Sequence, residues 1–315
     1  MTFLHTTAGP LEQGTTAFPA TPPRIGLDGT LRYDDLVYAC EPGYRPLFLD
    51  LRLPATPATG RYPLIVWIHG GGWTFGSRKR QAPNIDTHHV ISRLGAAGYA
   101  VALVDYRLAR EAPFPAQILD LRGAIRWLRG HADLLGIDPT RVAVWGESAG
   151  AHLALMTAWC DRDTATVVGE HPEQSEHVQA VVEWYGPADL SGVRLDPDTP
   201  DVSGETAGPS GDNPLRIILD GSDWTVAELS PMSYVRAGLP PTMIAHGADD
   251  RLVPVDQSRL LRKALADAGS PVEYLEVAGD HVFVGGGSID YVVERGLAFL
   301  DTVLATLGST ASTSA

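Results

Sequence analysis

The chain has no run of apolar residues approaching the roughly 20 that a membrane-spanning helix needs. It has only two cysteines in 315 residues, Cys40 and Cys160, which argues against a disulfide framework and for two unpaired thiols. At the N-terminus no basic segment precedes an apolar run, as it would in a signal peptide. From these absences we expect no membrane span and a cytoplasmic protein, or one secreted after processing.

Positive charge is also scarce, since 24 Lys and Arg against 38 Asp and Glu give a net charge of −14. Phosphate binding needs clustered Lys and Arg, so this balance excludes a general nucleic-acid surface. The basic run Arg78-Lys79-Arg80 is short, and we interpret it as a solvated loop. His88 and His89 are adjacent, would point about 100° apart on a helix, and have no evident carboxylate or cysteine partner, so we expect no metal site.

What the chain does have is enough apolar sequence, 44% of its residues, to bury one large core. We predict an irregular segment over residues 1–30, a single domain over 31–307 and a frayed tail over 308–315. Residues 186–230 are rich in Asp, Pro, Gly and Ser, which predicts a lid-like excursion with a short helix near 213–219.

Apolar runs alternate with helical spacings along this domain. The predicted strands cover residues 36–38, 47–53, 64–68, 99–106, 142–145, 178–184, 242–245 and 272–277. The predicted helices cover residues 87–98, 115–129, 255–268 and 291–307. After a leading antiparallel strand pair the order is strand, helix, strand, helix, which predicts the α/β class with a mostly parallel, doubly wound sheet.

The first chemical signal is a G-x-S-x-G turn centred on Ser148, between an apolar strand and an apolar helix. Gly146 and Gly150 flank the serine because only small neighbours fit a turn this tight. The serine hydroxyl is therefore expected to point out of the sheet. The N–H of Ala149, at the start of the helix, would face a negative oxygen forming nearby.

The second signal is His69-Gly70-Gly71-Gly72-Trp73, directly after the apolar run 64–68. Glycines at the end of a buried strand expose backbone N–H groups that no side chain blocks. The amides of Gly71 and Gly72 are therefore candidates for binding an oxyanion. Taken alone, the stretch could also be a flexible glycine loop.

A nucleophilic serine needs a base, and the base needs a carboxylate to hold its tautomer. In this kind of fold the chain order is serine, acid, histidine. Of the ten histidines only His281 lies beyond the strand-end acids near position 250, which makes it the candidate base. Two neighbouring acids, Asp249 and Asp250, are available, and only one of them should meet the imidazole.

Several polar residues near these motifs have structural interpretations. We expect His69 to order the glycine loop and His246 to begin a strand-end turn. We expect His152, one turn into the helix that follows Ser148, to be packed or part of a capping network. Glu147, next to the serine, is a candidate for a buried ion pair. Arg107 and Asp120 are candidates for a structural ion pair.

Taken together, these motifs resemble those of the α/β-hydrolase superfamily. The matching pieces are His69-Gly70-Gly71-Gly72-Trp73 with Gly76-Ser77, Asp105-Tyr106-Arg107-Leu108, Gly146-Glu147-Ser148-Ala149-Gly150, the stretch 246–254, and His281. More narrowly, the chain looks like the serine esterases near the hormone-sensitive-lipase and feruloyl/acetyl-xylan-esterase-like carboxylesterases.

The resemblance implies Ser148 as nucleophile, His281 as base and Asp250 as acid, because the family reads H-G-x-x-D-x-x-V-P at that strand end. It implies an oxyanion hole formed by Gly71, Gly72 and Ala149, and no cofactor. Asp280 departs from the family, where glycine is common, and could raise the pKa of the histidine or compete for its hydrogen bond.

We therefore expect a carboxylic ester hydrolase that forms an acyl-enzyme with small esters of short-chain or aromatic acids. One alternative keeps the triad but cleaves an amide, as in arylformamidases, which share an H-G-G-x-W type of loop. Another is a hydrolase-fold binding module without catalysis. Aromatic residues that could line the substrate pocket, or pack in the core, are Trp73, Phe75, Trp184, Tyr185, Trp224 and Phe283. The sequence leaves homo-oligomerisation open.

Overall fold

The computed structural model describes residues 23–26, 29–54, 60–162, 166–191, 213–285 and 289–310, the last five without their side chains. Most of the predicted irregular segment, the central part of the predicted excursion and the end of the predicted tail lie outside these residues. The short helix expected near 213–219 is present as α6 (Pro214–Leu219), with the Asn213 side chain accepting a hydrogen bond from the N–H of Leu215.

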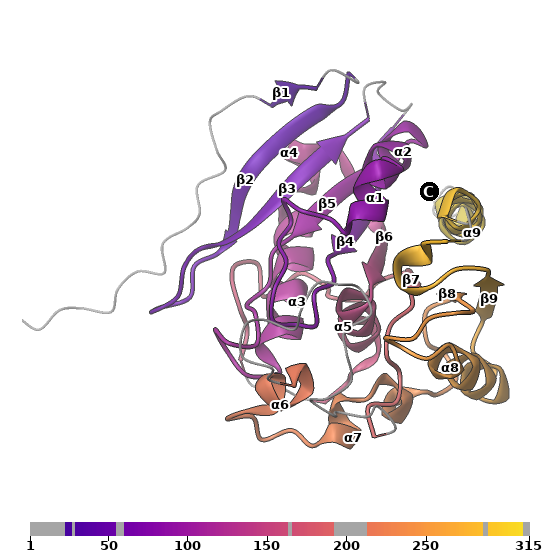
Figure 1. Cartoon of the computed structure of the whole chain (residues 1–315). Helices are drawn as coiled ribbons and strands as arrows, with labels where there is room; N and C mark the ends of the chain where they lie inside the picture. The colour runs from indigo at the N-terminus through magenta and orange to yellow at the C-terminus, as the bar shows by residue number, and fades with distance from the viewer. Residues whose placement is uncertain are drawn as a thin grey trace, which may run out of the picture.

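The described residues form one nine-stranded sheet with the order β1-β2-β3-β5-β4-β6-β7-β8-β9 (Figure 1). The strands are β1 Arg24–Ile25, β2 Leu31–Ala39, β3 Leu47–Leu53, β4 Tyr62–Ile68, β5 Ala100–Val104, β6 Ile137–Glu147, β7 Ala180–Trp184, β8 Thr242–Gly247 and β9 Val272–Val277. Strands β1, β2, β3 and β5 pair antiparallel, whereas the pairs from β5 through β4 to β9 are parallel. The predicted mostly parallel sheet with a leading antiparallel pair is confirmed, and the strand at Arg24 is an addition within the segment predicted to be irregular.

Helices cover both faces of this sheet. They are α1 Pro83–Thr87, α2 Val90–Ala96, α3 Ala116–Gly130, α4 Ala132–Leu135, α5 Ala149–Trp159, α6, α7 Val226–Leu229, α8 Asp256–Asp267 and α9 Ile289–Thr310, with 3₁₀ turns η1 Pro231–Tyr234 and η2 His281–Phe283. Apolar side chains of α3, α5 and α8 share one core cluster, and those of α1, α2 and α9 share another. Alternate residues of the central strands point into these two clusters, so both faces of the strands are buried, as parallel strands require.

One predicted helix is wrong in its extent. Apolar spacing predicted a helix over 87–98, but the chain forms α1 and α2 with a break at His89, whose φ of 50° is left-handed. Periodicity records which positions are apolar and does not reveal a reversed backbone angle. Helix α1 contacts the 3₁₀ turn η2, where the side-chain amide of Asn84 donates to the carbonyl oxygen of Val282 at 2.7 Å.

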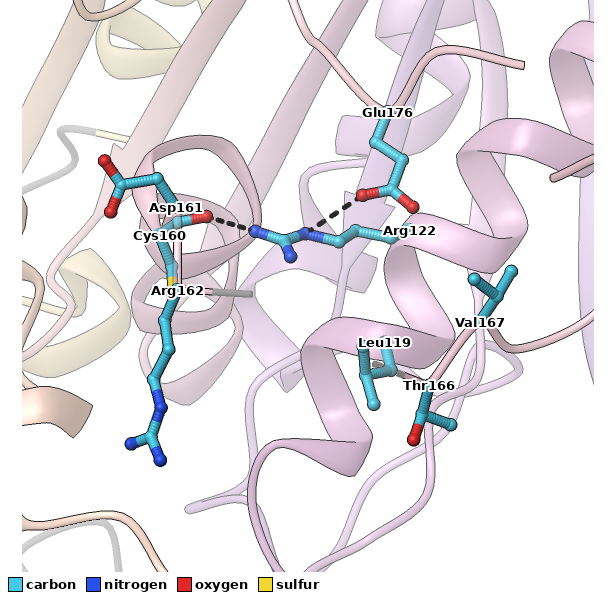
Figure 2. A pocket seen from close by; sticks show the side chains of 8 residues that line it. All are labelled: Leu119, Arg122, Cys160, Asp161, Arg162, Thr166, Val167 and Glu176. Atoms are coloured by element: carbon cyan, nitrogen blue, oxygen red, sulfur yellow. Dashed lines mark hydrogen bonds and ion pairs between the residues drawn. The ribbon is translucent and has the colours of Figure 1, made fainter. Parts of the chain in front are cut away.

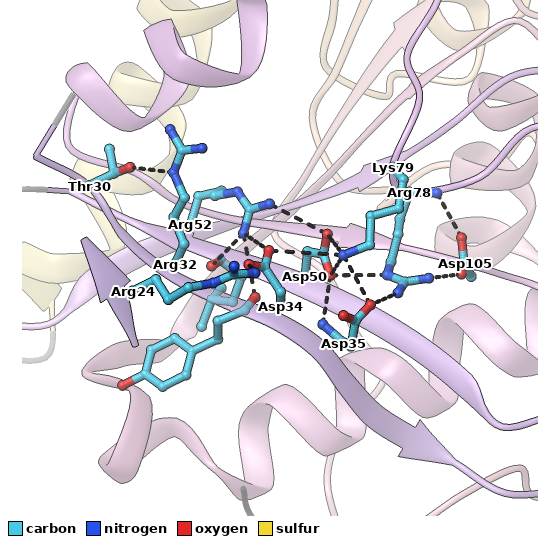
Figure 3. A network of polar contacts seen from close by, with 12 residues as sticks. Arg24, Thr30, Arg32, Asp34, Asp35, Asp50, Arg52, Arg78, Lys79 and Asp105 are labelled. Atoms are coloured by element: carbon cyan, nitrogen blue, oxygen red, sulfur yellow. Dashed lines mark hydrogen bonds and ion pairs between the residues drawn. The ribbon is translucent and has the colours of Figure 1, made fainter. Parts of the chain in front are cut away.

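The interpretation of the basic run as a solvated loop holds for Lys79 and Arg80, which are exposed, but not for Arg78, whose side chain is 9% exposed and lies among carboxylates (Figure 3). Its backbone N–H donates to Asp105 Oδ1 at 2.7 Å, and its Nε lies 3.0 Å from Asp50 Oδ1. Lys79 Nζ lies 2.9 Å from Asp50 Oδ2 and 3.0 Å from Asp35 Oδ1. The network ties the segment after the glycine loop to β2, β3 and the end of β5, and no local sequence pattern shows that these carboxylates converge.

The sheet brings the two glycine motifs together. Ile68 of β4 pairs with Gly146 of β6 in parallel register, so the glycine loop and the serine turn leave adjacent strands at the same edge. The segments that contain Asp250 and His281 follow β8 and β9 at this same carboxyl edge. In open α/β sheets this edge is where ligands bind.

Candidate active site

Ser148 occupies a strained turn between β6 and α5. Its φ of 53° and ψ of −122° lie in a region that residues with side chains rarely adopt. A Cβ at Gly146 would collide with the carbonyl of Gly150, and one at Gly150 would collide with the carbonyl of Ile68. The two glycines are therefore required by backbone packing, and they allow the serine to stand at the tip of the turn.

Ser148, His281 and Asp250 form one hydrogen-bonded chain. His281 Nε2 lies 3.0 Å from Ser148 Oγ, and His281 Nδ1 lies 2.6 Å from Asp250 Oδ2. Asp249, the alternative acid, is exposed to solvent. Because Nδ1 faces a carboxylate, it carries a proton, which leaves Nε2 able to accept the serine proton.

Four hydrogen-bond donors contact the Asp250 carboxylate. Its Oδ1 accepts hydrogen bonds from the N–H groups of Leu252 and Val253, both at 2.9 Å. Its Oδ2 is shared by His281 and by His246, whose Nε2 lies 3.1 Å away. Burial alone would raise the pKa of Asp250, but the hydrogen bonds from His246 and His281 outweigh burial and hold that pKa at about 2. The carboxylate is therefore ionised at neutral pH.

His246 is the polar contact that sequence reasoning missed. It was predicted to begin a strand-end turn, and it does lie at the end of β8, but its ring also reaches the acid four residues later. The available signal was the H-x-x-x-D spacing across a tight turn, where Asp250 N donates to the Gly247 carbonyl at 3.2 Å.

The glycine loop has an unusual backbone that supports open amides. Gly71, Gly72 and Trp73 have φ values of 108°, 55° and 61° in succession. His69 stacks on Tyr106 with ring centroids 4.4 Å apart, and its Nδ1 lies 2.8 Å from the Gly70 carbonyl, as expected of a residue that orders the loop. Among the described residues, no acceptor takes the N–H of Gly71, Gly72 or Ala149.

Glu147 supports the glycine loop by hydrogen bonding instead of forming the predicted ion pair. Its Oε1 accepts the N–H of Gly70 at 2.9 Å, and its Oε2 accepts the hydroxyl of Tyr185 at 3.2 Å. No Lys or Arg in the described parts of the chain pairs with it. Burial raises the pKa of this carboxyl group, since the backbone and tyrosine donors replace only part of its hydration.

His152 is packed, as predicted. Its Nδ1 accepts the indole N–H of Trp73 at 3.2 Å, and its Nε2 lies 2.8 Å from the carbonyl of Leu229. Burial lowers the pKa of His152 to about 4, so the ring is neutral at neutral pH. Trp73, a candidate pocket residue, is thus anchored on α5 and almost fully buried.

Three other candidate pocket aromatics belong to the core. Trp184, Tyr185 and Phe283 are at most 1% exposed, so they do not line an open pocket. Trp184 and Phe283 pack edge to face at 5.4 Å, and Tyr185 lies 4.7 Å from the His281 ring. Their position at strand ends suggested a pocket, but the side chains turn into the core cluster and support the histidine. Trp224 packs edge to face on Phe114 at 4.8 Å and is also largely buried.

Phe75, the remaining candidate pocket aromatic, follows the glycine loop and is 45% exposed.

Asp280 contacts the backbone of its own turn, because its Oδ1 accepts the N–H of Val284 at 3.0 Å. Within the described part of the chain, no hydrogen bond joins its carboxylate to the neighbouring imidazole. The predicted structural pair is confirmed, since Arg107 Nη2 lies 2.6 Å from Asp120 Oδ1 within the protein. Burial raises the pKa of Asp120 to about 6 despite this partner.

A cavity of about 380 Å³ lies away from these residues, at the opposite end of α5. It is lined by Leu119, Arg122, Cys160, Asp161, Arg162, Thr166, Val167 and Glu176. The Arg122 guanidinium is already engaged by the Cys160 carbonyl and by Glu176 (Figure 2). Because α5 begins at Ser148 and ends at Trp159, this cavity is separated from the serine by the length of the helix.

The described residues contain neither a metal-binding cluster nor a helix suited to span a membrane. No group of three or more His, Cys, Asp and Glu side chains there is arranged to hold a metal ion. None of the helices in that part of the chain is both long and apolar enough to cross a bilayer.

Comparison with known proteins points to one family. A family model described as BD-FAE matches residues 49–265. Esterase LipQ of Mycobacterium tuberculosis is 31% identical over 243 residues, which are 76% of this chain and 55% of that protein. The chain spans about half the length of the curated relatives it matches.

Solved structures agree with this result. A truncated carbohydrate esterase from gut microbiota has a TM-score of 0.72 at 26% identity, covering 90% of this chain and 100% of that one. Esterase 2 of Thermogutta terrifontis with butyrate bound has a TM-score of 0.68 at 28% identity, covering 87% and 94%. The same esterase phosphorylated by paraoxon has a TM-score of 0.65 at 26% identity, covering 88% and 95%. The chain belongs to the BD-FAE family of α/β-hydrolases.

Proposed function

We propose that this protein is a serine carboxylic ester hydrolase that works through an acyl-enzyme. The observation that carries the proposal is the chain of contacts from Ser148 Oγ through His281 to Asp250, at 3.0 and 2.6 Å. This arrangement supplies a nucleophile, a base and an anion that orients the base. The names of the relatives support the same reaction class, since LipQ and esterase 2 are both described as esterases.

In the first half-reaction, Ser148 Oγ attacks the ester carbonyl carbon while its proton passes to His281 Nε2. The negative oxygen of the tetrahedral intermediate is bound by the N–H groups of Gly71, Gly72 and Ala149. Each such donor is worth about 3 kcal/mol in the transition state. The intermediate then collapses, the bond to the alcohol oxygen breaks, and His281 returns the proton to the departing alcohol.

In the second half-reaction, His281 takes a proton from a water molecule, and the resulting nucleophile attacks the acyl carbon on Ser148. The same amides stabilise the second tetrahedral oxyanion. Its collapse breaks the bond to Ser148 Oγ, which regains its proton from His281, and the carboxylic acid leaves. No cofactor is needed at any step of this scheme.

For the substrate, we propose esters of short-chain or aromatic acids. The support is the butyrate found in esterase 2 of Thermogutta terrifontis and the carbohydrate esterase among the structural neighbours. The decisive comparison is a panel of p-nitrophenyl esters from acetate to palmitate, together with methyl ferulate and N-formylkynurenine, for the wild type and Ser148→Ala. We expect turnover of short or aromatic esters that the substitution abolishes. A preference for N-formylkynurenine would move the scissile bond to an amide, and turnover unaffected by the substitution would refute the role of the serine.

A further inference from the structure

The acid of the site is shared between two histidines. His246 lies on β8, is fully buried, and its Nε2 is 3.1 Å from the same Asp250 Oδ2 that His281 Nδ1 contacts at 2.6 Å. Together with the two backbone N–H groups on Oδ1, these contacts satisfy all four acceptor positions of the carboxylate. The mechanism proposed above assigns no step to His246, the fourth of these donors.

The contacts of His246 determine where its proton lies. Besides Asp250 Oδ2, its Nε2 lies 2.8 Å from the carbonyl oxygen of Val253. Both neighbours of Nε2 are acceptors, so this nitrogen must be a donor. Its Nδ1 lies 2.7 Å from Ser258 Oγ, and a hydroxyl can donate to a neutral ring or accept from a charged one. The ring therefore keeps every hydrogen bond in either charge state.

Charged groups reach His246 from three neighbouring segments. Asp250 contacts its ring directly. Glu183 on β7 and Glu276 on β9 interact with it electrostatically, and Glu276 also forms an ion pair with Arg259. Burial alone would lower the pKa of His246, but the Asp250 hydrogen bond and the Glu183 charge outweigh burial and raise it. His281 faces it across the shared carboxylate oxygen.

We propose that His246 is a positioning residue for the hydrolysis. It holds Asp250 Oδ2 against His281 and weakens the attraction of that oxygen for the Nδ1 proton of His281. The proposal rests on the function proposed above. A hydrogen bond donated to a carboxylate oxygen stabilises its negative charge and so lowers its attraction for any other proton. His246 thereby limits how basic His281 becomes, and it removes the freedom of the carboxylate to rotate away.

Two substitutions separate these effects from simple support of the core. His246→Phe keeps a ring of similar volume but removes the donor to Asp250. His246→Gln places an amide N–H₂ near the position of Nε2 and serves as the matched control, because it restores the donor without a titrating ring. If the phenylalanine variant does not fold, His246→Asn replaces it, since the shorter amide can reach Ser258 but not Asp250.

For His246→Phe, we expect kcat to fall about tenfold with KM nearly unchanged, since a lost hydrogen bond to a charged group has an effect of this order. The acid limb of the kcat/KM profile should move upward by roughly half a pH unit, because Asp250 Oδ2 then attracts only the His281 proton. His246→Gln should return both quantities most of the way to the wild-type values. A purely structural role would lower the melting temperature and leave the acid limb in place, and that result would overturn the proposal.

A second measurement is independent of turnover. The Nδ1 proton of His281 can be followed by ¹H NMR as a downfield resonance, because it lies in the 2.6 Å bond to Asp250. We expect it to move in His246→Phe and to return in His246→Gln, and an unchanged resonance in both variants would overturn the proposal. Ser148→Ala is measured alongside for activity. If the wild type shows no Ser148-dependent turnover, the proposed function fails, while the NMR result still decides whether His246 acts on the histidine–aspartate pair.

Discussion

Glu183 provides a quantitative test of how burial acts on a carboxyl group beside the site. It lies on β7, is fully buried, and its Oε1 accepts the N–H of Gly186, whereas its Oε2 has no partner among the described residues. Burial raises the pKa of Glu183 from 4.5 to about 7, although the His246 charge and the Gly186 N–H oppose it. The folded state therefore holds a proton that the unfolded state has already lost between these two pH values.

The sign of the effect follows from this proton. Because the folded state binds it more tightly, the stability that protonated Glu183 contributes is present below pH 4.5 and is lost as pH rises through about 7. The interval between the two pKa values corresponds to ~3 kcal/mol of unfolding free energy. Glu183→Gln keeps the shape of the side chain and an acceptor for Gly186, but it has no proton to lose.

We expect the wild type to lose up to ~3 kcal/mol relative to Glu183→Gln between about pH 5 and pH 9. The measurement is urea denaturation of both proteins across this range, with equal slopes required for the comparison. Glu294→Gln is the control, because the Glu294 side chain is 68% exposed and its removal should leave the pH dependence unchanged. If wild type and Glu183→Gln differ by the same amount at every pH, the assignment of a buried neutral carboxyl group is refuted.

Three further substitutions test the loop and the buried ion pairs. Gly71→Ala places a Cβ against a backbone carbonyl at a φ of 108°, so kcat/KM should fall about 100-fold, whereas Gly95→Ala, which has room in α2, should leave it unchanged. Asp120→Asn leaves the Arg107 guanidinium buried without its counter-charge and should cost about 3 kcal/mol in urea denaturation, and a loss below about 1 kcal/mol would contradict this. Arg78→Met removes one of several cations around the buried carboxylate of β3 and should cost only about 1–2 kcal/mol, and a loss of folding would show that the network depends on it more than this.

The alternation of strands and helices along the chain, the serine and the histidine could be predicted from sequence because each leaves a local mark. Buried parallel strands read as apolar runs, the serine turn needs glycines at fixed spacing, and a single histidine lies late enough in the chain to follow the acid. The choice between Asp249 and Asp250 was different. The residues alone left it open, and only the family pattern favoured the second.

The contacts that could not be predicted from sequence depend on the direction in which turns and side chains point in the folded chain. His246 and Asp250 meet because a turn folds back by four residues, and Trp184 points into the core because of the face of β7 on which it lies. The Arg78 side chain is largely covered because carboxylates on β2, on β3 and directly after β5 converge on it. The break at His89 is a backbone angle that hydrophobic spacing does not record.

The central claim, that Ser148 forms a covalent intermediate through His281, is tested most directly by trapping. Paraoxon phosphorylates esterase 2 of Thermogutta terrifontis, so the same reagent is suited to this chain. Wild-type protein, Ser148→Ala and His281→Gln are treated with it, and the adducts are mapped by mass spectrometry. The account predicts one phosphoryl group per chain on Ser148, none on Ser148→Ala, and much slower labelling of His281→Gln. Labelling at another residue, or equal labelling of all three proteins, would contradict it.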